Sequence, residues 1–519
     1  MRFSVGQVLK QVCGAEWMSH PPVLPQGQFK SPARDLLWLI NPFYPKDART
    51  SFGKHVLTPS LALTSLAAAT PPDFQVKYWD ENLLQGQPHG PLPGLAAITV
   101  HLSFASRAYQ LAAWLRARGT RVVMGGPHAL ACSAEVGRHA DAVVVGNGVS
   151  VWPQVLDDYR QGRLRQCYLG SYHAQFLEEP IPDRAPLPSG AFLTRASVIA
   201  SRGCHNRCEF CLLATRELSL PLQKRPPQAV AAELQAIGEP YAVFLDNNLG
   251  SDPRYLRELC AALAPLKIIW SAALSLDAAA DPGLVRAMAL SGCTGVFIGF
   301  ESLNSENLAQ AGKPAPSFAS YARQVACFHE WGIQVNGSFV FGFDADDAKV
   351  FDQTAGWIEE QRLECATFHI LTPYPGTPLF ARLEAEGRIL TRDWDLYDTG
   401  HVVFRPARMT VEDLQEGYTR IYKRTFSLTS IWRRRPLNWH AVPPYLAMAW
   451  LYKRANWLWP MLIHFGWTAA CWQPLVRLSR RRHLHFREQL RARPQIPPDI
   501  FASASRNKPF GSRLERNLP

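Results

Sequence analysis

The sequence has little of what marks a secreted or membrane-spanning protein. Its 11 cysteines are scattered over 519 residues, mostly in apolar segments where buried free thiols are common, so no disulfide framework is expected. The N-terminus lacks the long apolar core of a secretory signal. The apolar run WLWPMLIHFGWTAAC has 15 residues, fewer than the ~20 that a spanning helix needs. These absences indicate a globular protein of a reducing compartment, which we expect to be the cytoplasm.

Net charge is almost absent from the first 430 residues and is concentrated after them. The whole chain carries +12, whereas residues 431–519 contain 16 Lys and Arg against 3 Asp and Glu, and 7 of the 16 tryptophans. Aromatic and basic residues together are typical of helices that lie on a membrane surface. The same pattern suits a helical layer packed on the rest of the protein, and both alternatives stay open. No recognised RNA-binding module accompanies the arginines, so no nucleic-acid partner is expected.

Two regions alternate short apolar strands with helices. The first spans residues 31–170, after an N-terminal extension over 1–30, and predicts a doubly wound parallel sheet of the Rossmann type. Ligands of such sheets bind at the carboxyl ends of the strands. Two glycine-rich turns lie there and allow a large flat ligand to approach, although tight turns need glycine in any case: Gly125-Gly126 with His128, and Gly146 with Gly148.

The second region, residues 187–400, predicts an incomplete parallel (β/α)6 barrel, whose active site faces the carboxyl ends of its strands. Asp246, Glu301 with Ser302, and Gly342 each follow an apolar strand. They are candidates for function, and they are also the residue types that form turns. A helical segment over 401–430, an aromatic and basic helical extension over 431–492 and a disordered tail over 493–519 are expected to follow.

Three cysteines in the run SRGCHNRCEFC carry the strongest chemical signal. Cys204, Cys208 and Cys211 have CxxxCxxC spacing, which folds one loop around three irons of a cubane iron–sulfur cluster. The fourth iron is left without a nearby cysteine, as a reactive cluster requires. A zinc loop is the alternative, but structural zinc sites usually take paired CxxC units and a fourth Cys or His.

The cysteine motif, with Phe210 before its last cysteine, resembles the radical S-adenosylmethionine (SAM) superfamily. The resemblance implies that the three cysteines hold a 4Fe–4S cluster, whose open iron binds SAM, and that one electron then cleaves SAM to a 5′-deoxyadenosyl radical. It also implies a low-potential electron donor such as flavodoxin or ferredoxin. By the same resemblance Glu301 and Ser302 contact the SAM ribose, the GSFVFG segment with Gly337, Phe339 and Gly342 lies on the adenine side, and Asp246 is the acidic residue after the second strand.

The order of the two regions resembles the branch of radical SAM proteins that carry a cobalamin-binding domain, including hopanoid-methylase-like and cyclase-like members. This implies that residues 31–170 bind cobalamin at the two glycine turns. Two departures stand out. The DxHxxG motif that supplies a histidine to cobalt is absent, and Asn147 and Val149 stand where members commonly carry acidic residues.

The resulting hypothesis is a cobalamin-dependent C-methyltransferase that acts on an unactivated carbon of a small-molecule or lipid-like substrate. The alternatives are radical cyclisation or rearrangement without methyl transfer, and a non-catalytic protein that binds the cluster and SAM. The tail adds the expectation of peripheral contact with the inner face of the membrane.

Overall fold

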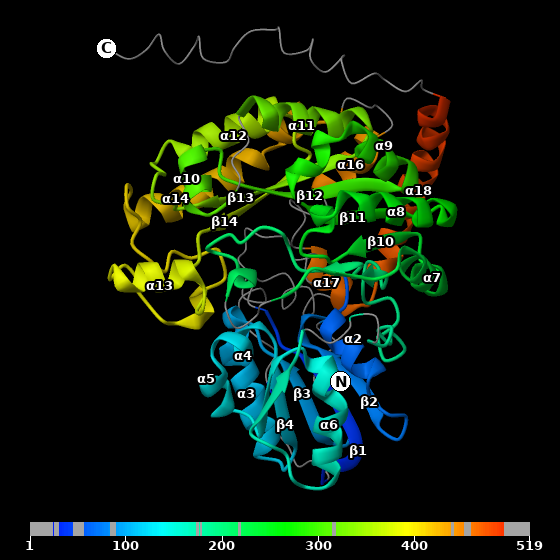
Figure 1. The fold of residues 1–519 in the computed structure, drawn as a ribbon, viewed down its shortest axis with the longest axis vertical. Coiled ribbons are helices and arrows are strands. Elements are labelled where there is room, and N and C mark those ends of the chain that lie inside the picture. The colour runs from blue at the N-terminus through cyan, green and yellow to red at the C-terminus, as the bar shows by residue number, and fades with distance from the viewer. Residues whose placement is uncertain are drawn as a thin grey trace, which may run out of the picture.

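The computed structural model describes residue 24 and residues 31–44, 57–83, 90–172, 176, 179–215, 220–313, 318–436, 441–450 and 458–492. These residues form two stacked lobes, with the N-terminal sheet below the barrel in Figure 1. The expected extension over 1–30, apart from Leu24, and the expected disordered tail over 493–519 lie outside the described residues.

The N-terminal lobe is built on a parallel six-stranded sheet in the order β2-β1-β3-β4-β5-β6. The central strand β1 has five consecutive buried residues, as expected of a strand covered on both faces. The predicted doubly wound sheet is thereby confirmed. Its elements are β1 (Ala33–Asn41), α2 (Leu61–Ala68), β2 (Gln75–Asp80), β3 (Pro93–Thr99), α3 (Ala105–Arg116), β4 (Arg121–Gly125), α4 (Pro127–Ala131), α5 (Ser133–Gly137), β5 (Ala142–Gly146), α6 (Gly148–Arg160) and β6 (Cys167–Gly170).

The second lobe contains the predicted incomplete barrel. Its parallel strands follow the order β7-β10-β11-β12-β13-β14, with β7 and β14 at the two edges. The strands are β7 (Ser197–Val198), β10 (Tyr241–Phe244), β11 (Ile269–Leu274), β12 (Cys293–Glu301), β13 (Gln334–Phe341) and β14 (Cys365–Ile370), and a small antiparallel pair, β8 (Ser201–Arg202) and β9 (Gln223–Lys224), flanks the cysteine loop.

The helices of this lobe begin at local signals in the sequence. Asp252 and Asp281 each cap a helix by accepting a backbone N–H, and a proline follows at the first helical position, where its missing N–H costs nothing. Thr377 and Pro378 repeat the arrangement. The helices are α7 (Pro227–Ile237), α8 (Pro253–Leu263), α9 (Pro282–Ser291), α10 (Ser305–Gln310), α11 (Phe318–Glu330), α12 (Val350–Glu360), α13 (Pro378–Ala385) and α14 (Val411–Thr425).

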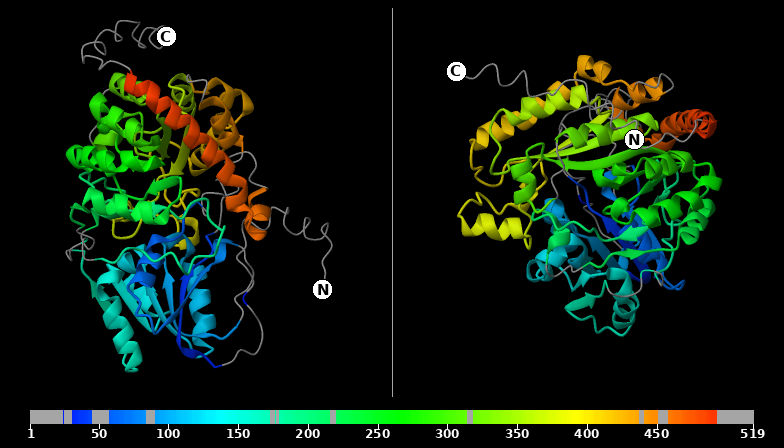
Figure 2. Two further views of the ribbon diagram at one scale, coloured as in Figure 1. Left: turned by 90° about the vertical axis from the view of Figure 1, so that its right-hand side faces the viewer. Right: turned by 45° about the horizontal axis from the view of Figure 1, so that its top comes forward.

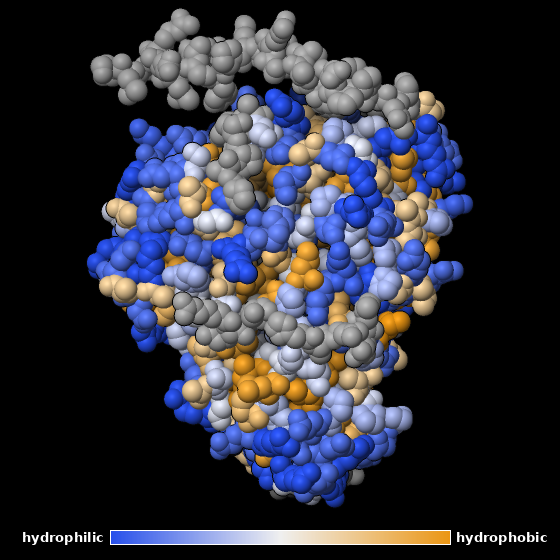
Figure 3. Space-filling model, in the orientation of Figure 1, coloured by the Kyte–Doolittle hydropathy of each residue, from blue (hydrophilic) through white to orange (hydrophobic). Residues whose placement is uncertain are grey.

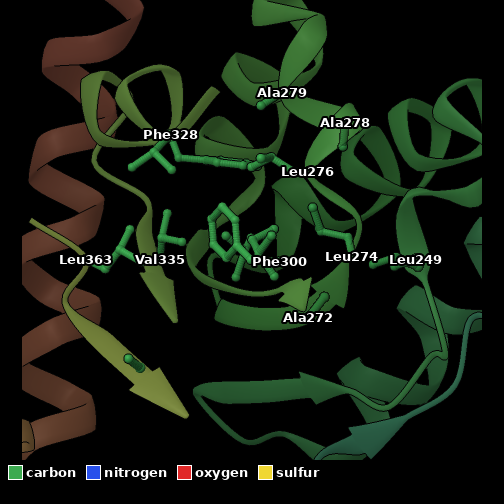
Figure 4. Packing of buried hydrophobic residues seen from close by; sticks show 14 of the residues in the cluster. Leu249, Ala272, Leu274, Leu276, Ala278, Ala279, Phe300, Phe328, Val335 and Leu363 are labelled. Atoms are coloured by element: carbon green, nitrogen blue, oxygen red, sulfur yellow. The ribbon is translucent and has the colours of Figure 1, made fainter. Parts of the chain in front are cut away.

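Aromatic packing fills the core of the barrel lobe. Phe300 of β12 stacks on Phe339 of β13 with ring centroids 5.3 Å apart, and both side chains are buried. Figure 4 shows Phe300 between Val335 and Leu274. The strand ends therefore project from a rigid support.

The C-terminal extension packs along the barrel, and its described residues form α15 (Leu428–Arg433), α16 (Val442–Ala449), α17 (Leu458–His464) and α18 (Thr468–Ala492). In Figure 2, α18 runs along the barrel lobe toward the N-terminal lobe. Trp459 and Trp472 are buried in the hydrophobic core of the N-terminal lobe. Within the part of the chain that the structure describes, no helix combines the length and apolar character needed to cross a membrane.

One arginine expected at the surface of this extension is buried. The Arg434 side chain has no exposed area and donates to the carbonyls of Leu363 and Thr425, each at 2.6 Å. Sequence alone counts Arg434 as a surface charge, but it binds the carbonyl of Thr425, the last residue of α14, and the carbonyl of Leu363 just before β14. The extension is thus a covering layer at least in part, while Trp432, Trp450, Phe465 and Trp467 remain exposed.

Candidate active site between the two lobes

A cavity of about 780 Å³ lies between the carboxyl ends of the N-terminal sheet and the cysteine loop of the barrel. One wall comes from α2 and from the ends of β3, β4 and β5, and the other carries Arg202, Phe210 and Cys211. Most of the lining is apolar, and the volume lies in the range of small-molecule sites. Figure 3 shows apolar surface where the two lobes meet. The cavity joins the two regions that the sequence singled out.

The cysteine loop begins two residues after β8 and turns tightly. Cys211 N–H donates to the Cys208 carbonyl at 2.9 Å, and Asn206 N–H donates to Cys204 Sγ at 3.4 Å. Burial raises the pKa of the Cys208 thiol to about 11, and a bound metal would favour its thiolate.

The spacing of the three sulfurs argues against a single zinc ion. Among the described His, Cys, Asp and Glu residues, one set of three ligand atoms lies within 4.8 Å of one another, and it consists of His128, Cys132 and Glu135. Cys204, Cys208 and Cys211 do not form such a set, so at least one pair of their Sγ atoms is more than 4.8 Å apart. Three thiols on one tight loop that do not converge on a single ion fit a multi-iron cluster.

The loop is braced from two directions. The Asp246 carboxylate, fully buried after β10, accepts from Ala200 N–H at 3.0 Å and from both the N–H and the hydroxyl of Ser201. Burial raises the pKa of Asp246 to about 6. On the other side, Arg382 of α13 pairs with Glu209, within the motif itself, at 3.1 Å. Asp246 thus holds the strand that leads into the loop.

Glu301 lies at the end of β12 in a strained conformation. Its φ is +60°, a region that residues other than glycine rarely adopt and that often marks a functional site. Its carboxylate pairs with Lys313 at 2.9 Å, and Lys313 also donates to the Gly299 carbonyl. The neighbouring Ser302 is buried, and its hydroxyl accepts from Asn307 at 3.1 Å.

The three residues of the GSFVFG segment lie deeper than Glu301. The Phe339 ring is in the core, and an added Cβ at Gly337 would lie 2.9 Å from Leu363. Gly342 has φ +106°, and its N–H donates to Asp346 at 2.9 Å. The side chains of this segment are used in packing, so any contact with a ligand would come from its backbone.

The glycine turns border the cavity directly. Gly125, Gly126, Gly146 and Gly148 all line it. Gly126 and Gly146 have φ of +124° and +93°, and an added Cβ would meet backbone oxygens at 2.7 and 2.2 Å. These two glycines are therefore required by the turns themselves. Gly125 and Gly148 have no such requirement. Because they lack side chains, a ligand in the cavity could approach their backbone closely.

His128 lies behind the cavity wall. It is buried and absent from the lining, and its Nε2 lies 3.1 Å from the Tyr109 hydroxyl and 3.2 Å from Glu135. Burial lowers its pKa. No histidine is among the described residues that line the cavity, and His55 lies outside the described residues.

Several site residues were missed by sequence reasoning. Glu179, from the segment between the two lobes, lines the cavity and forms a bidentate ion pair with Arg202. Arg225 also lines it and pairs with the buried Glu233 at 2.7 Å. Arg202 stands beside the cysteine motif and could have been noticed, whereas nothing in the sequence around Glu179 singles it out.

Known proteins resemble the chain over both lobes. It is 30% identical over 403 residues to bacteriochlorophyllide d C-12(1)-methyltransferase of Chlorobaculum tepidum, covering 73% of this chain and 86% of that protein. The bacteriochlorophyllide d C-8(2)-methyltransferase of the same organism is 26% identical over 67% of this chain and 81% of its own length.

The fold agrees with a solved structure. The radical SAM methyltransferase TsrM from Kitasatospora setae, with cobalamin and a 4Fe–4S cluster bound, superimposes with a TM-score of 0.57 at 14% identity, covering 86% of this chain and 99% of that chain. Residues 377–488 match a domain of unknown function (DUF4070). With its two lobes, its cysteine loop and these relatives, the chain belongs to the family of cobalamin-dependent radical SAM methyltransferases.

Proposed function

We propose that this protein transfers a methyl group to an unactivated carbon of a tetrapyrrole of the bacteriochlorophyllide type. The observation that carries the proposal is that one mostly apolar cavity is bordered by both the glycine turns and the cysteine loop. The substrate class is supported by the two relatives, whose names give bacteriochlorophyllide d as their substrate. A flat, largely apolar macrocycle also suits a lining of this character.

In the proposed function, the two walls of the cavity bind different cofactors. Cys204, Cys208 and Cys211 would hold the cluster, and the turns at Gly125 and Gly148 would border cobalamin. When bound, the cluster supplies the electron that cleaves SAM to the 5′-deoxyadenosyl radical, and cobalamin supplies the methyl group. The apolar lining excludes water from the reacting carbon and so prevents side reactions of a radical.

The remaining polar residues would position SAM. Glu301 is our candidate for the residue that contacts the SAM ribose. Its backbone is strained, as is common at functional sites, and its carboxylate is held in place by the ion pair with Lys313. Ser302 and Asp246 would support the site indirectly, by holding the neighbouring backbone in place. Their side chains are already hydrogen-bonded to Asn307 and to Ala200. Phe210 lines the cavity beside Cys211. Gly337, Phe339 and Gly342 would shape the adenine side through the backbone.

The test is an anaerobic reaction of the reconstituted protein with SAM, a low-potential reductant, cobalamin and a bacteriochlorophyllide. We expect a product heavier by one methylene group, together with 5′-deoxyadenosine and S-adenosylhomocysteine. Cys208→Ala should abolish all three products, whereas Cys167→Ala, at an exposed position on β6, should retain them. Formation of 5′-deoxyadenosine without S-adenosylhomocysteine would instead indicate cyclisation or rearrangement.

We also propose that a flavodoxin or ferredoxin supplies the electron.

We further propose that the C-terminal extension docks the enzyme on the cytoplasmic face of an anionic membrane. Phe465 and Trp467 are stacked and exposed at the turn between α17 and α18, and Trp432 is exposed beside Arg435. Indole rings favour the membrane interface, and each nearby basic residue adds about 1 kcal/mol at an anionic surface. Co-sedimentation with anionic but not neutral vesicles, weakened by salt and by Trp467→Ser, is expected.

A further inference from the structure

Three polar side chains, hydrogen-bonded in series, join the two walls of the cavity. Asn147 lies between Gly146 and Gly148 in the second glycine turn, Glu179 belongs to the segment between the lobes, and Arg202 precedes Gly203 and Cys204. All three line the cavity. They therefore connect the wall that borders cobalamin in the proposed function with the strand that leads into the cysteine loop.

The contacts in this chain are specific. Asn147 Nδ2 donates to Glu179 Oε1 at 2.7 Å, while its Oδ1 accepts from Val149 N–H and caps α6. Both terminal nitrogens of Arg202 donate to the two Glu179 oxygens. The guanidinium lies over the Phe176 ring at 3.9 Å. With side-chain exposures of 18% and 12% for Arg202 and Glu179, the pair is shielded from water and keeps a fixed geometry.

The arrangement accounts for one departure of the sequence from its family. Asn147 stands where the family resemblance implies an acidic residue, and in this chain a carboxylate reaches the same turn from Glu179. An aspartate at position 147 would place like charges at hydrogen-bond distance in a shielded site, which is unfavourable. Asn147 and Glu179 therefore form a matched donor and acceptor.

We propose that Glu179 is a positioning residue that fixes the cobalamin-side turn relative to the cysteine loop and so couples radical formation to methyl transfer. This inference rests on the proposed function. Methyl transfer requires the carbon radical to meet the methyl group within a narrow range of geometry, and small misplacements cost large factors in rate. Radical formation itself needs only the cluster loop and SAM, so the two activities should separate when the link is broken.

The experiment uses Asn147→Asp, Glu179→Gln and the double variant that carries both changes. Asn147→Asp keeps the shape and the cap oxygen but repels Glu179. The double variant restores a donor and an acceptor between positions 147 and 179, but it loses one of the two Arg202 contacts, because Glu179 Oε1 accepts from both Asn147 and Arg202. We expect the ratio of methylated product to 5′-deoxyadenosine to fall by about 10- to 100-fold in Asn147→Asp. The double variant should recover part of that loss, because the contact between positions 147 and 179 returns while one contact with Arg202 does not. Asp73→Asn, which breaks an exposed ion pair with Arg160 at the far end of α6, is the matched control.

A second readout does not depend on turnover. Electron paramagnetic resonance of protein holding Co(II) and the reduced cluster reports their spin–spin interaction, which should change in Asn147→Asp and Glu179→Gln and shift back toward the wild-type value in the double variant. If the unmodified protein makes no methylated product, the proposed substrate reaction fails while this measurement still tests the link. Wild-type product ratios and an unchanged spin–spin interaction in folded Asn147→Asp and Glu179→Gln would overturn the inference.

Discussion

Asp246 offers a direct measure of how the fold sets up its cysteine loop. Its carboxylate is fully buried and holds the backbone at Ala200 and Ser201, yet burial raises its pKa from 3.8 to about 6. The residue is therefore mostly charged at neutral pH and costs stability in that form. We expect Asp246→Asn to leave the free energy of unfolding nearly unchanged at pH 7.5, while the variant retains less iron and cleaves SAM more slowly.

The magnitude follows from the shift in pKa. A change of about two units corresponds to about 3 kcal/mol of differential stability between the two protonation states. Asparagine removes this cost but turns its NH2 group toward the backbone N–H of either Ala200 or Ser201, and two donors that face each other cost about 1–3 kcal/mol. The two effects nearly cancel. Because the folded-state pKa is raised, the contribution of Asp246 is fully present below pH 3.8 and is lost as the pH rises through about 6.

The assay compares urea unfolding of the cluster-free wild-type and Asp246→Asn proteins at pH 7.5 and at pH 5. Wild type should gain about 1.4 kcal/mol over the variant on going to pH 5, roughly half of the full effect. Iron content after reconstitution is measured on the same samples. A stability difference that does not depend on pH, or that shifts in favour of the variant at pH 5, would refute the reasoning, as would wild-type iron content in Asp246→Asn.

Three further results are expected. Gly146→Ala should destabilise the protein by about 1–3 kcal/mol and weaken cobalamin binding, because φ is +93° and the new Cβ meets the Gly170 carbonyl; Gly162→Ala, also at positive φ but with open space, should leave cobalamin binding intact. Burial lowers the pKa of His483 from 6.5 to about 4. Its stabilising contribution of about 3 kcal/mol is therefore present above pH 6.5 and is lost as the pH falls through 4. Acid-unfolding curves of His483→Gln should lack this loss. Bound Co(II) cobalamin should show no nitrogen superhyperfine splitting from an axial imidazole or benzimidazole, because no described residue that lines the cavity is a histidine. Splitting from either nitrogen base would contradict this prediction.

The features that sequence predicted are those with a short-range signal. The two sheets follow from apolar runs such as DLLWLIN, and the cysteine loop follows from the spacing of three residues within eight positions. Asp246 and Glu301 were singled out as candidates because polar residues after apolar strands gather at one edge of a parallel sheet. These inferences need only local periodicity and the geometry of parallel strands.

The features that sequence missed depend on contacts between distant segments. Glu179 and Arg202 are 23 residues apart, and Arg382 reaches Glu209 across 173 residues, so no local pattern announces either pair. Arg434 was counted as a surface charge because only the packed fold brings carbonyls around it. The Phe339 ring is buried because alternation along β13 directs it to the core, a signal that the motif resemblance outweighed.

The central claim, that one cavity couples a SAM-derived radical to methyl transfer from cobalamin, is tested most directly by product stoichiometry with methyl-deuterated SAM. Reconstituted protein is incubated anaerobically with reductant, cobalamin and the bacteriochlorophyllide, and the three products are quantified together. The account predicts equal amounts of 5′-deoxyadenosine, S-adenosylhomocysteine and tetrapyrrole carrying the deuterated methyl group. Tetrapyrrole changed without the deuterated methyl group, or 5′-deoxyadenosine formed without S-adenosylhomocysteine, would contradict it.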